Sequence, residues 1–399
     1  MLQETISRIR GLFNQEPAPH EFGLVLTGGG ARAAYQVGIL QYIADNYQDV
    51  RFTILIGVSA GAINAAHLAD HPGTFREAVK LLVENWKELR SEDVYEVEST
   101  GTLLKTLVTR SIRIGKLDPN EASQLRAMAN TAPLRSHLER HLRTEDGRLF
   151  GVAERLQSGK LRAAAIVGTN YSTGQTVSWV QGDSFERWER PNRVGINTTL
   201  TLDHIMASTS LPFLFPAVQI GDAWFGDGGI RLAAPLAPAI HLGADRILAI
   251  STRYSRTRAE ADQPVVQGYP PASQIFGILT NAVFLDALED DALILRRINL
   301  LLKQMPPEKR HGLRPINLLM LRPSVDLGKL AGDFRATLPG PLALFSKILG
   351  TEETKSPDWL SMLLFEYDYV GRLMDIGYED ARHHHAQIEA FLSDHPPAD

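Results

Sequence analysis

The 399-residue chain contains no cysteine, which excludes disulfide bonds, thiolate metal ligands and a cysteine nucleophile. It also lacks any apolar run near the roughly 20 residues that would span a bilayer. The first ten residues are too polar for a signal peptide. A formal net charge of -5 gives no indication of a nucleic-acid partner. We therefore expect a cytoplasmic protein. No spacing of side chains predicts a bound metal, and we expect no cofactor.

The N-terminal segment, residues 1–20, is predicted to form a short helix. Leu2, Ile6, Ile9 and Phe13 recur at helical spacing, and Pro17 ends the pattern. Such a helix could dock on the domain or on a second subunit, or it could be an interfacial membrane anchor. We favour docking. The sequence does not determine the oligomeric state.

The most informative stretch is Gly57-Val58-Ser59-Ala60-Gly61. An apolar run, residues 52–56, precedes it and predicts a buried strand. An alanine-rich run, residues 60–69, follows and predicts a helix. Strand, sharp turn and helix form the setting of a nucleophile elbow, in which glycines permit a tight turn and the helix directs free N–H groups at the serine. Ser59 is therefore the candidate nucleophile.

An earlier glycine-rich turn, Thr27-Gly28-Gly29-Gly30-Ala31-Arg32, joins a predicted strand over residues 22–26 to a predicted helix. Two interpretations compete. The spacing Gly28-x-Gly30-x-x-Ala33 fits a dinucleotide-binding turn. Backbone N–H groups at such a turn could equally form an oxyanion hole for acyl transfer. The next strand leads into Ser59 rather than an acidic residue that would hold a ribose, which favours the oxyanion hole.

Strands and helices continue to alternate, which predicts an α/β fold with a mostly parallel central sheet and helices on both faces. We expect three segments: 1–20, an α/β core over 21–255, and a mostly helical extension over 256–399 that adds at least one strand, residues 316–321, to the same fold. The other expected elements are a helix with a core-facing stripe over 74–90, a helix over 133–143, a hairpin over 161–180, a helix over 202–207, a helix over 235–242, a strand over 246–251 and a helical region over 273–302. The apolar segment 207–216 could line an acyl-chain channel or form a buried loop.

Asp227-Gly228-Gly229 follows another apolar run and places a carboxylate at a strand end, although Asp-Gly is also a common turn dipeptide. The main mechanistic alternative is a Ser-His-Asp triad, whose chain order of serine, acid and histidine would use Asp227 and His241. His241 lies in a helical run, which makes a surface histidine the better interpretation.

Three motifs thus stand in order: Gly28-Gly29-Gly30-Ala31-Arg32, Gly57-Val58-Ser59-Ala60-Gly61 and Asp227-Gly228-Gly229. Together they resemble the patatin-like phospholipase family over about residues 22–251, as does the segment 207–212. Ala33 departs from the pattern, because the family's glycine-rich segment often continues with glycine.

The resemblance implies a patatin-like three-layer sandwich and a catalytic dyad of Ser59 and Asp227 without histidine. It implies an oxyanion hole from Gly28, Gly29, Gly30 and Ala60. Supporting roles would fall to Arg32, which we expect to brace the loop, and to the motif glycines Gly57, Gly61, Gly228 and Gly229.

The implied activity is hydrolysis of lipid carboxylic esters, of phospholipase A or lysophospholipase type, through an acyl-Ser59 intermediate. The partner would be a phospholipid or other lipid ester, with possible peripheral membrane contact. Three alternatives stay open: a non-catalytic lipid-binding or scaffold protein, a dinucleotide-binding oxidoreductase and an acyltransferase.

Overall fold

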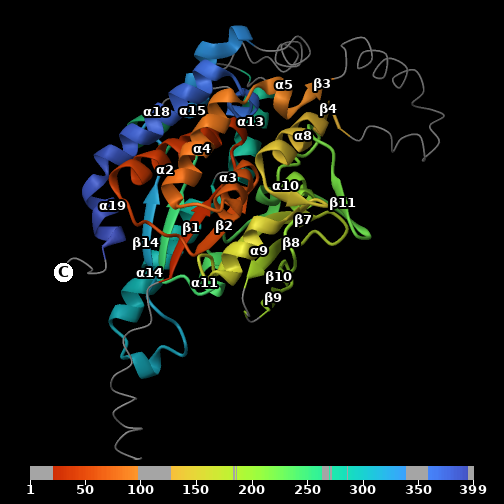
Figure 1. Cartoon of the computed structure of the whole chain (residues 1–399). Helices are drawn as coiled ribbons and strands as arrows, with labels where there is room; N and C mark the ends of the chain where they lie inside the picture. Colours follow the sequence, from red (N-terminus) through yellow and green to blue (C-terminus); the bar gives the residue numbers. More distant parts are fainter. Residues whose placement is uncertain are drawn as a thin grey trace, which may run out of the picture.

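The computed structural model describes residues 21–97, 127–182, 185, 187–262, 269, 272–284, 286–337 and 358–393 (Figure 1). The helix expected over residues 1–20 lies outside the described residues. None of the described helices is both long enough and apolar enough to cross a membrane.

One large sheet organises the chain. Its ten strands follow the order β14-β13-β1-β2-β7-β8-β10-β9, with β12 paired to β7 and β11 paired to β12. From β14 to β7 the neighbours are parallel, whereas β8 and β12 run antiparallel to β7. The strands of this sheet are β1 (Phe22–Leu26), β2 (Ile54–Val58), β7 (Ala163–Asn170), β8 (Thr176–Gly182), β9 (Glu189–Arg190), β10 (Arg193–Asn197), β11 (Val218–Ile220), β12 (Ala223–Asp227), β13 (Arg246–Ile250) and β14 (Asn317–Leu321).

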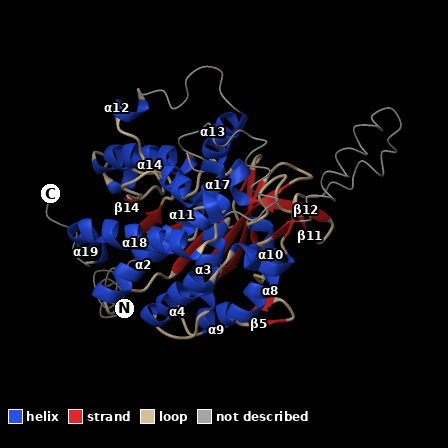
Figure 2. Cartoon of the chain, turned by 90° about the horizontal axis from the view of Figure 1, so that it is seen from above, coloured by secondary structure: helices blue, strands red, loops and turns tan. Residues whose placement is uncertain are grey.

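Helices cover both faces of this sheet (Figure 2). The helices are α2 (Ala34–Asn46), α3 (Ala60–Asp70), α4 (Phe75–Glu88), α5 (Ser91–Val94), α8 (Ala132–His141), α9 (Phe150–Gln157), α10 (Leu202–Ser208), α11 (Ala237–His241), α12 (Arg258–Ala261), α13 (Ala272–Phe284), α14 (Ala287–Lys303), α15 (Leu327–Ala331), α17 (Asp358–Leu363), α18 (Tyr367–His383) and α19 (His385–Leu392). Short 3-10 turns are η1 (Gly30–Ala33), η2 (Gly228–Arg231), η3 (Pro307–Lys309) and η4 (Gly332–Thr337), and two small ribbons pair β3 (Glu96–Val97) with β4 (Ala129–Asn130) and β5 (Thr144–Glu145) with β6 (Arg148–Leu149).

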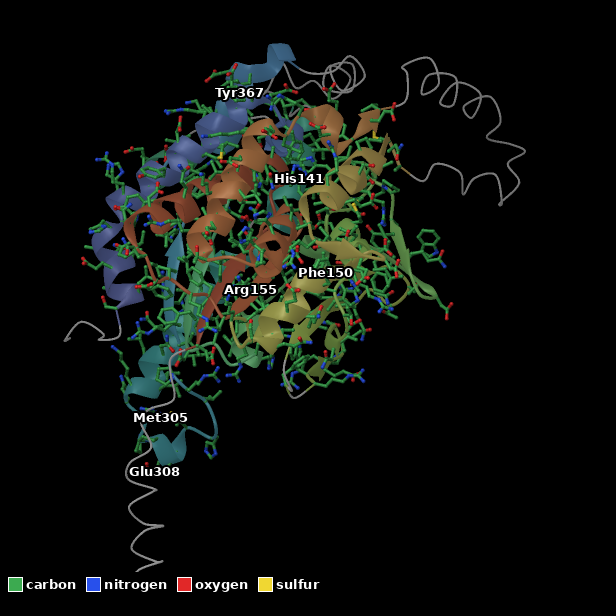
Figure 3. All side chains as sticks on the ribbon, in the orientation of Figure 1. His141, Phe150, Arg155, Met305, Glu308 and Tyr367 are labelled. Atoms are coloured by element: carbon green, nitrogen blue, oxygen red, sulfur yellow. The ribbon has the colours of Figure 1, made fainter. Side chains whose placement is uncertain are left out.

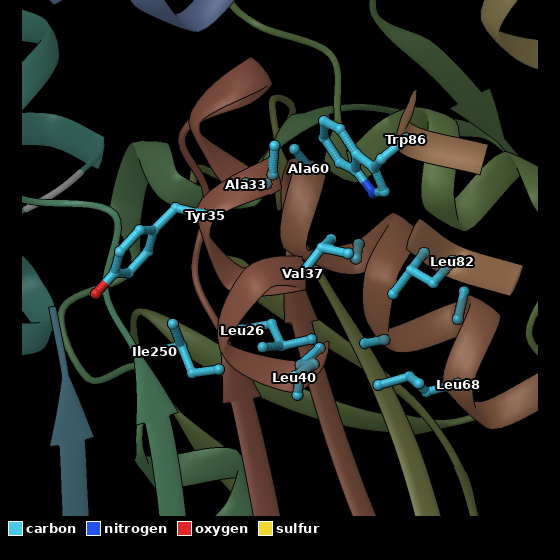
Figure 4. Close-up of a cluster of buried hydrophobic side chains, with 14 of the residues drawn as sticks. Leu26, Ala33, Tyr35, Val37, Leu40, Ala60, Leu68, Leu82, Trp86 and Ile250 are labelled. Carbon is cyan, nitrogen blue, oxygen red and sulfur yellow. The ribbon is translucent and has the colours of Figure 1, made fainter. Parts of the chain in front are cut away.

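Side chains of each central strand alternate between two buried clusters, as the period of two in a β-strand requires. In β1, Leu24 and Leu26 join the cluster under α2, α3 and α4, while Val25 joins the cluster under α11 and α14. Figure 4 shows part of the first cluster, where Leu26 packs with Leu40. The predicted mostly parallel α/β sandwich is thereby confirmed.

Most expected elements are present, with shifted ends. Strand β2 begins two residues later than the apolar run suggested and runs directly into Ser59. Phe52 is instead a buried residue before the strand, and its ring packs edge-on against Phe75 at a centroid distance of 5.5 Å. The hairpin of β7 and β8 is antiparallel, as expected.

The C-terminal extension joins the same body. β14 pairs with β13 in the sheet, and α18 packs against α2. The Tyr35 hydroxyl donates a hydrogen bond of 3.0 Å to Asp380, which ties these two helices together in the interior. The boundary near residue 255 stays a prediction.

Candidate active site

Ser59 occupies a strained turn between β2 and α3. Its backbone has φ 53° and ψ -133°, a conformation that a non-glycine residue adopts at an energetic cost. The flanking glycines explain how the turn closes: a Cβ on Gly57 would lie 2.4 Å from Ala62 Cα, and one on Gly61 would lie 2.3 Å from the Leu26 carbonyl oxygen. The motif thus folds as the predicted elbow, with Ser59 buried at its apex.

Strand register brings Asp227 to the same place. β2 ends with Val58 opposite Val167 of β7. β12 then pairs with the next part of β7, and Asp227 stands opposite Gly168. Because β2 and β12 lie end to end along one edge of β7, Ser59 and Asp227 meet where these strands end, although they are far apart in the sequence.

The segment before β11 fixes both residues, a role that the sequence did not reveal. The Ser59 N–H donates to Ser208 Oγ at 2.9 Å, and the Ser208 hydroxyl donates to the Val167 carbonyl at 2.6 Å. The Asp227 N–H donates to the Ser210 carbonyl at 3.0 Å. Ser208 and Ser210 are both buried. The signal was available in the motif at 207–212, but sequence alone gave no partner for either serine.

The Asp227 carboxyl is fully buried, and burial raises its pKa to about 7. Two interactions oppose this rise: hydrogen bonding with the Ser59 hydroxyl, and the Gly229 N–H, which donates to Oδ1 at 2.8 Å. Oδ2 has no hydrogen bond of ordinary geometry within the described residues. A carboxylate whose pKa lies near neutrality is a much better proton acceptor than an ordinary aspartate.

The glycine-rich turn lies against the elbow. A Cβ on Gly28 would be 2.9 Å from the Ser59 Cβ, so only a glycine permits this approach. Gly29 has φ 142°, and the Thr252 hydroxyl donates to the Gly28 carbonyl at 2.6 Å. Gly30 and Ala60 line the same pocket as Ser59. The structure therefore brings together all four residues predicted to form the oxyanion hole.

The C-terminal extension approaches the glycine turn closely at Gly30. A Cβ on Gly30 would lie 2.0 Å from the Met362 carbonyl oxygen, close to the end of α17. Arg32 is buried, and its Nε donates to Ser361 Oγ at 2.5 Å. Arg32 thus contacts a hydroxyl of the C-terminal extension. Gly228 also packs tightly, since a Cβ there would lie 2.2 Å from the Val167 carbonyl oxygen.

Ser59 opens onto an apolar pocket that encloses about 740 Å³ of space unfilled by protein atoms, part of it open to solvent. Part of the α4 stripe predicted to face the core contributes to the wall of this pocket, and Leu211 and Phe215 of segment 207–216 also line it. Its lining includes Leu82, Trp86, Leu89, Val94, Leu134, Leu138, Leu142, Leu211, Phe215, Met362 and Phe365.

His241 lies away from this site. It is the last residue of α11, which leads into the start of β13. Because β13, β1 and β2 run parallel, His241 lies at the end of the sheet where these strands begin, whereas Ser59 lies at the end where they finish. Its ring stacks on Trp188 at a centroid distance of 4.9 Å. A triad that includes His241 is therefore not supported.

A strained serine at a strand–helix turn, a buried carboxyl beside it and an apolar pocket are typical of α/β serine hydrolases. Residues 24–240 match the patatin-like phospholipase family, and since this is more than half of the chain, the protein belongs to that family. This membership places the chain among lipid acyl hydrolases in general.

Solved structures similar to the chain include human GIVD cytosolic phospholipase A2, with 14% identity, a TM-score of 0.46, and coverage of 94% of this chain and 60% of that one. The same human protein in complex with methyl gamma-linolenyl fluorophosphonate gives 14% identity, a TM-score of 0.44, and coverage of 94% and 58%. VipD from Legionella pneumophila gives 15% identity, a TM-score of 0.34, and coverage of 90% and 67%. The chain thus spans about 60% of the length of the human protein. A comparison with curated proteins gives no significant match.

Proposed function

We propose that this protein hydrolyses carboxylic ester bonds in lipids, as a phospholipase A or lysophospholipase, through an acyl-Ser59 intermediate with Asp227 as the general base. The observation that carries the proposal is the strand register, which sets a buried Asp227 beside Ser59 at the head of an apolar pocket. Both residues are needed because a serine hydroxyl is a poor nucleophile until a base takes its proton.

In the proposed reaction the Ser59 oxygen attacks the ester carbonyl while its proton passes to Asp227. The carbonyl oxygen becomes an oxyanion that the N–H groups of the glycine turn and of Ala60 stabilise. Each such donor contributes roughly 3 kcal/mol. Collapse breaks the ester bond, and the departing alcohol or lysolipid takes the proton. Water then attacks the acyl-enzyme and gives a proton to Asp227. Collapse breaks the bond between the acyl group and Ser59, the proton passes from Asp227 to the Ser59 oxygen, and the fatty acid leaves.

We further propose peripheral contact with a lipid surface through Phe213. This side chain is 82% exposed and lies between Leu211 and Phe215, which both line the pocket. Its φ of 66° is unusual for a residue with a bulky side chain. The exposed ring of Phe213 does not gain the hydrophobic free energy that burial would provide. An aromatic ring held outward beside the pocket fits insertion into a lipid surface, from which a substrate chain could enter.

The test is a panel of phospholipids, lysophospholipids and neutral esters given to the wild type, Ser59→Ala and Asp227→Asn. We expect both variants to lose activity. Matched controls are Ser172→Ala and Asp222→Asn, because both side chains are exposed in turns. Activity that survives in Ser59→Ala would overturn the nucleophile, and full activity in Asp227→Asn would overturn only the base.

Labelling with a fluorophosphonate separates the remaining alternatives. A non-catalytic lipid-binding protein would leave Ser59 unlabelled. An acyltransferase would be labelled, but it would transfer the acyl group to an added alcohol in preference to water. Thermal stabilisation by a nicotinamide dinucleotide would instead support the oxidoreductase alternative.

A further inference from the structure

Three histidines interrupt the otherwise largely apolar pocket. They are His67 from α3, and His137 and His141 from α8. The proposed chemistry at Ser59 and Asp227 uses none of them. Figure 3 labels His141 in the upper part of the molecule, far from Met305 and Glu308.

His67 lies about two turns of α3 away from the reacting serine along the pocket. Ala60, Ile63 and His67 follow one another at spacings of three and four residues, so they share one face of α3, and all three line the pocket. The eight residues from Ser59 to His67 correspond to roughly 12 Å of helix. His137 and His141 are likewise four residues apart, and their rings stack at a centroid distance of 4.1 Å.

The imidazoles of His67 and His137 are uncharged at neutral pH, and the protein uses only part of their hydrogen-bonding capacity. Burial lowers the pKa of His67 and of His137 to about 4. His67 Nε2 donates to the Ala78 carbonyl at 2.9 Å, and His141 Nδ1 donates to the His137 carbonyl at 2.8 Å. Within the part of the chain that the structure describes, the ring nitrogens of His137 make no hydrogen bond. They are not among the fully buried polar atoms, and since His137 lines the pocket they are open to a partner there. A neutral imidazole offers one donor and one acceptor.

Two other uses of this histidine group fit the structure less well. Among the described residues, no three histidine, aspartate or glutamate side chains are arranged to hold a metal ion. A charged lipid head group would lose its hydration against the neutral rings of His67 and His137 and the apolar side chains of the lining, which is costly without a countercharge. An acyl chain suits the apolar lining, and a polar group on that chain would suit His137.

We propose that the pocket selects acyl chains that carry a hydroxyl group in their middle portion, with His137 as the main hydrogen-bonding partner and His67 and His141 beside it. The inference rests on the proposed acyl hydrolysis at Ser59. A site built to hydrogen-bond a substrate hydroxyl discriminates against the analogue that lacks it, because the buried polar group of the site is then left unpaired.

The experiment compares p-nitrophenyl esters of stearic acid with those of hydroxystearic acids whose hydroxyl stands at successive mid-chain carbons. For the wild type we expect kcat/KM to be roughly tenfold higher for the best hydroxylated ester than for the plain one. His137→Phe should remove this preference, so that the kcat/KM values for the hydroxylated and the plain ester become equal within error. The matched control is His241→Phe, which changes a histidine at the end of the sheet opposite to Ser59. This variant should keep the wild-type ratio of the two kcat/KM values. A wild-type ratio at or below one would overturn the proposal.

A binding measurement keeps this inference distinct from the proposed function. Trp86 lines the pocket, so its fluorescence can report the binding of free hydroxystearic and stearic acids to Ser59→Ala. If no ester is hydrolysed, the proposed function is wrong. The inference is then supported if hydroxystearic acid binds more tightly than stearic acid, and it is contradicted if it does not. If His137→Phe does not fold, as judged by its melting temperature, His137→Gln replaces it, and this variant should retain part of the preference because its amide still offers a donor and an acceptor.

Discussion

Replacing Asp227 by asparagine should stabilise the protein at neutral and alkaline pH while it abolishes activity. The carboxyl is fully buried, and its pKa rises to about 7, mainly because burial disfavours the charged form. The folded protein therefore binds this proton more tightly than the unfolded chain does, where an aspartate has a pKa of about 3.9. Asparagine carries no charge at any pH, and its Oδ1 can still accept the hydrogen bond from the Gly229 N–H.

The sign of the effect follows from linkage. Below about pH 4 the carboxyl is protonated in both states, so its neutral form contributes fully to stability. Above pH 4 the unfolded chain releases this proton, whereas the folded protein keeps it until the pH reaches about 7. The contribution of the carboxyl to the free energy of unfolding therefore falls as the pH rises and is lost above about 7. A pKa increase from about 4 to about 7 corresponds to about 4 kcal/mol, which should be reached near pH 8.

The assay is thermal unfolding of the wild type, Asp227→Asn and the exposed control Asp222→Asn at pH steps from about 4 to 8. A stabilisation of 1 kcal/mol raises the melting temperature by roughly 2–4 °C in domains of 150–250 residues. We expect the advantage of Asp227→Asn to be near zero at the acid end and to grow to several degrees at the alkaline end. Asp222→Asn should show no such trend. An advantage that is constant with pH, or largest at low pH, would refute the reasoning.

Three further outcomes are expected. Because Asp227 must be ionised to accept the serine proton, kcat/KM should rise with pH with a midpoint near 7, and a profile flat from pH 5 to 9 would contradict this assignment. Ser208→Ala should lower kcat more than it raises KM and should destabilise the fold by about 1–3 kcal/mol, because the Ser59 N–H and the Val167 carbonyl lose a buried partner. Ser208→Thr should restore part of the activity and part of the stability. Unchanged kinetics in Ser208→Ala would show that the turn at Ser59 does not need this hydrogen bond. Phe213→Ser should weaken sedimentation with phosphatidylcholine vesicles, whereas Leu301→Ser, which changes a 62% exposed side chain near the end of α14, should not; equal losses would exclude a specific contact through Phe213.

The elements that shape the elbow could be predicted because their signals are local. An apolar run, two glycines and an alanine-rich segment surround Ser59 within a few residues. The partner of Ser59 was harder to establish. Asp227 could be proposed from its motif, but its position depends on the pairing of β12 with β7, and strand pairing between distant segments leaves no signal in a single sequence.

The roles that escaped prediction depend on tertiary packing. Ser208 could be seen as part of a motif, yet its hydrogen bond to Ser59 exists only because α10 ends beside the elbow. The stripe of α4 looked like ordinary core, since an apolar side chain that faces a pocket has the same spacing as one that faces a neighbour. His137 gave no signal, because only the fold brings it to the pocket of Ser59.

The closure of α17 over the glycine turn links the proposed activity to the order of protein synthesis. Met362 fills the space above Gly30, and Ser361 binds Arg32 in the turn. A ribosome makes these residues some three hundred positions after the turn that they complete, as the separation of 329 residues between Arg32 and Ser361 shows. A nascent chain with the elbow, the aspartate and the glycine turn already folded would still lack this brace. The site would then become competent only after Ser361 and Met362 have been made, so that a shorter nascent chain would not attack the lipids around it.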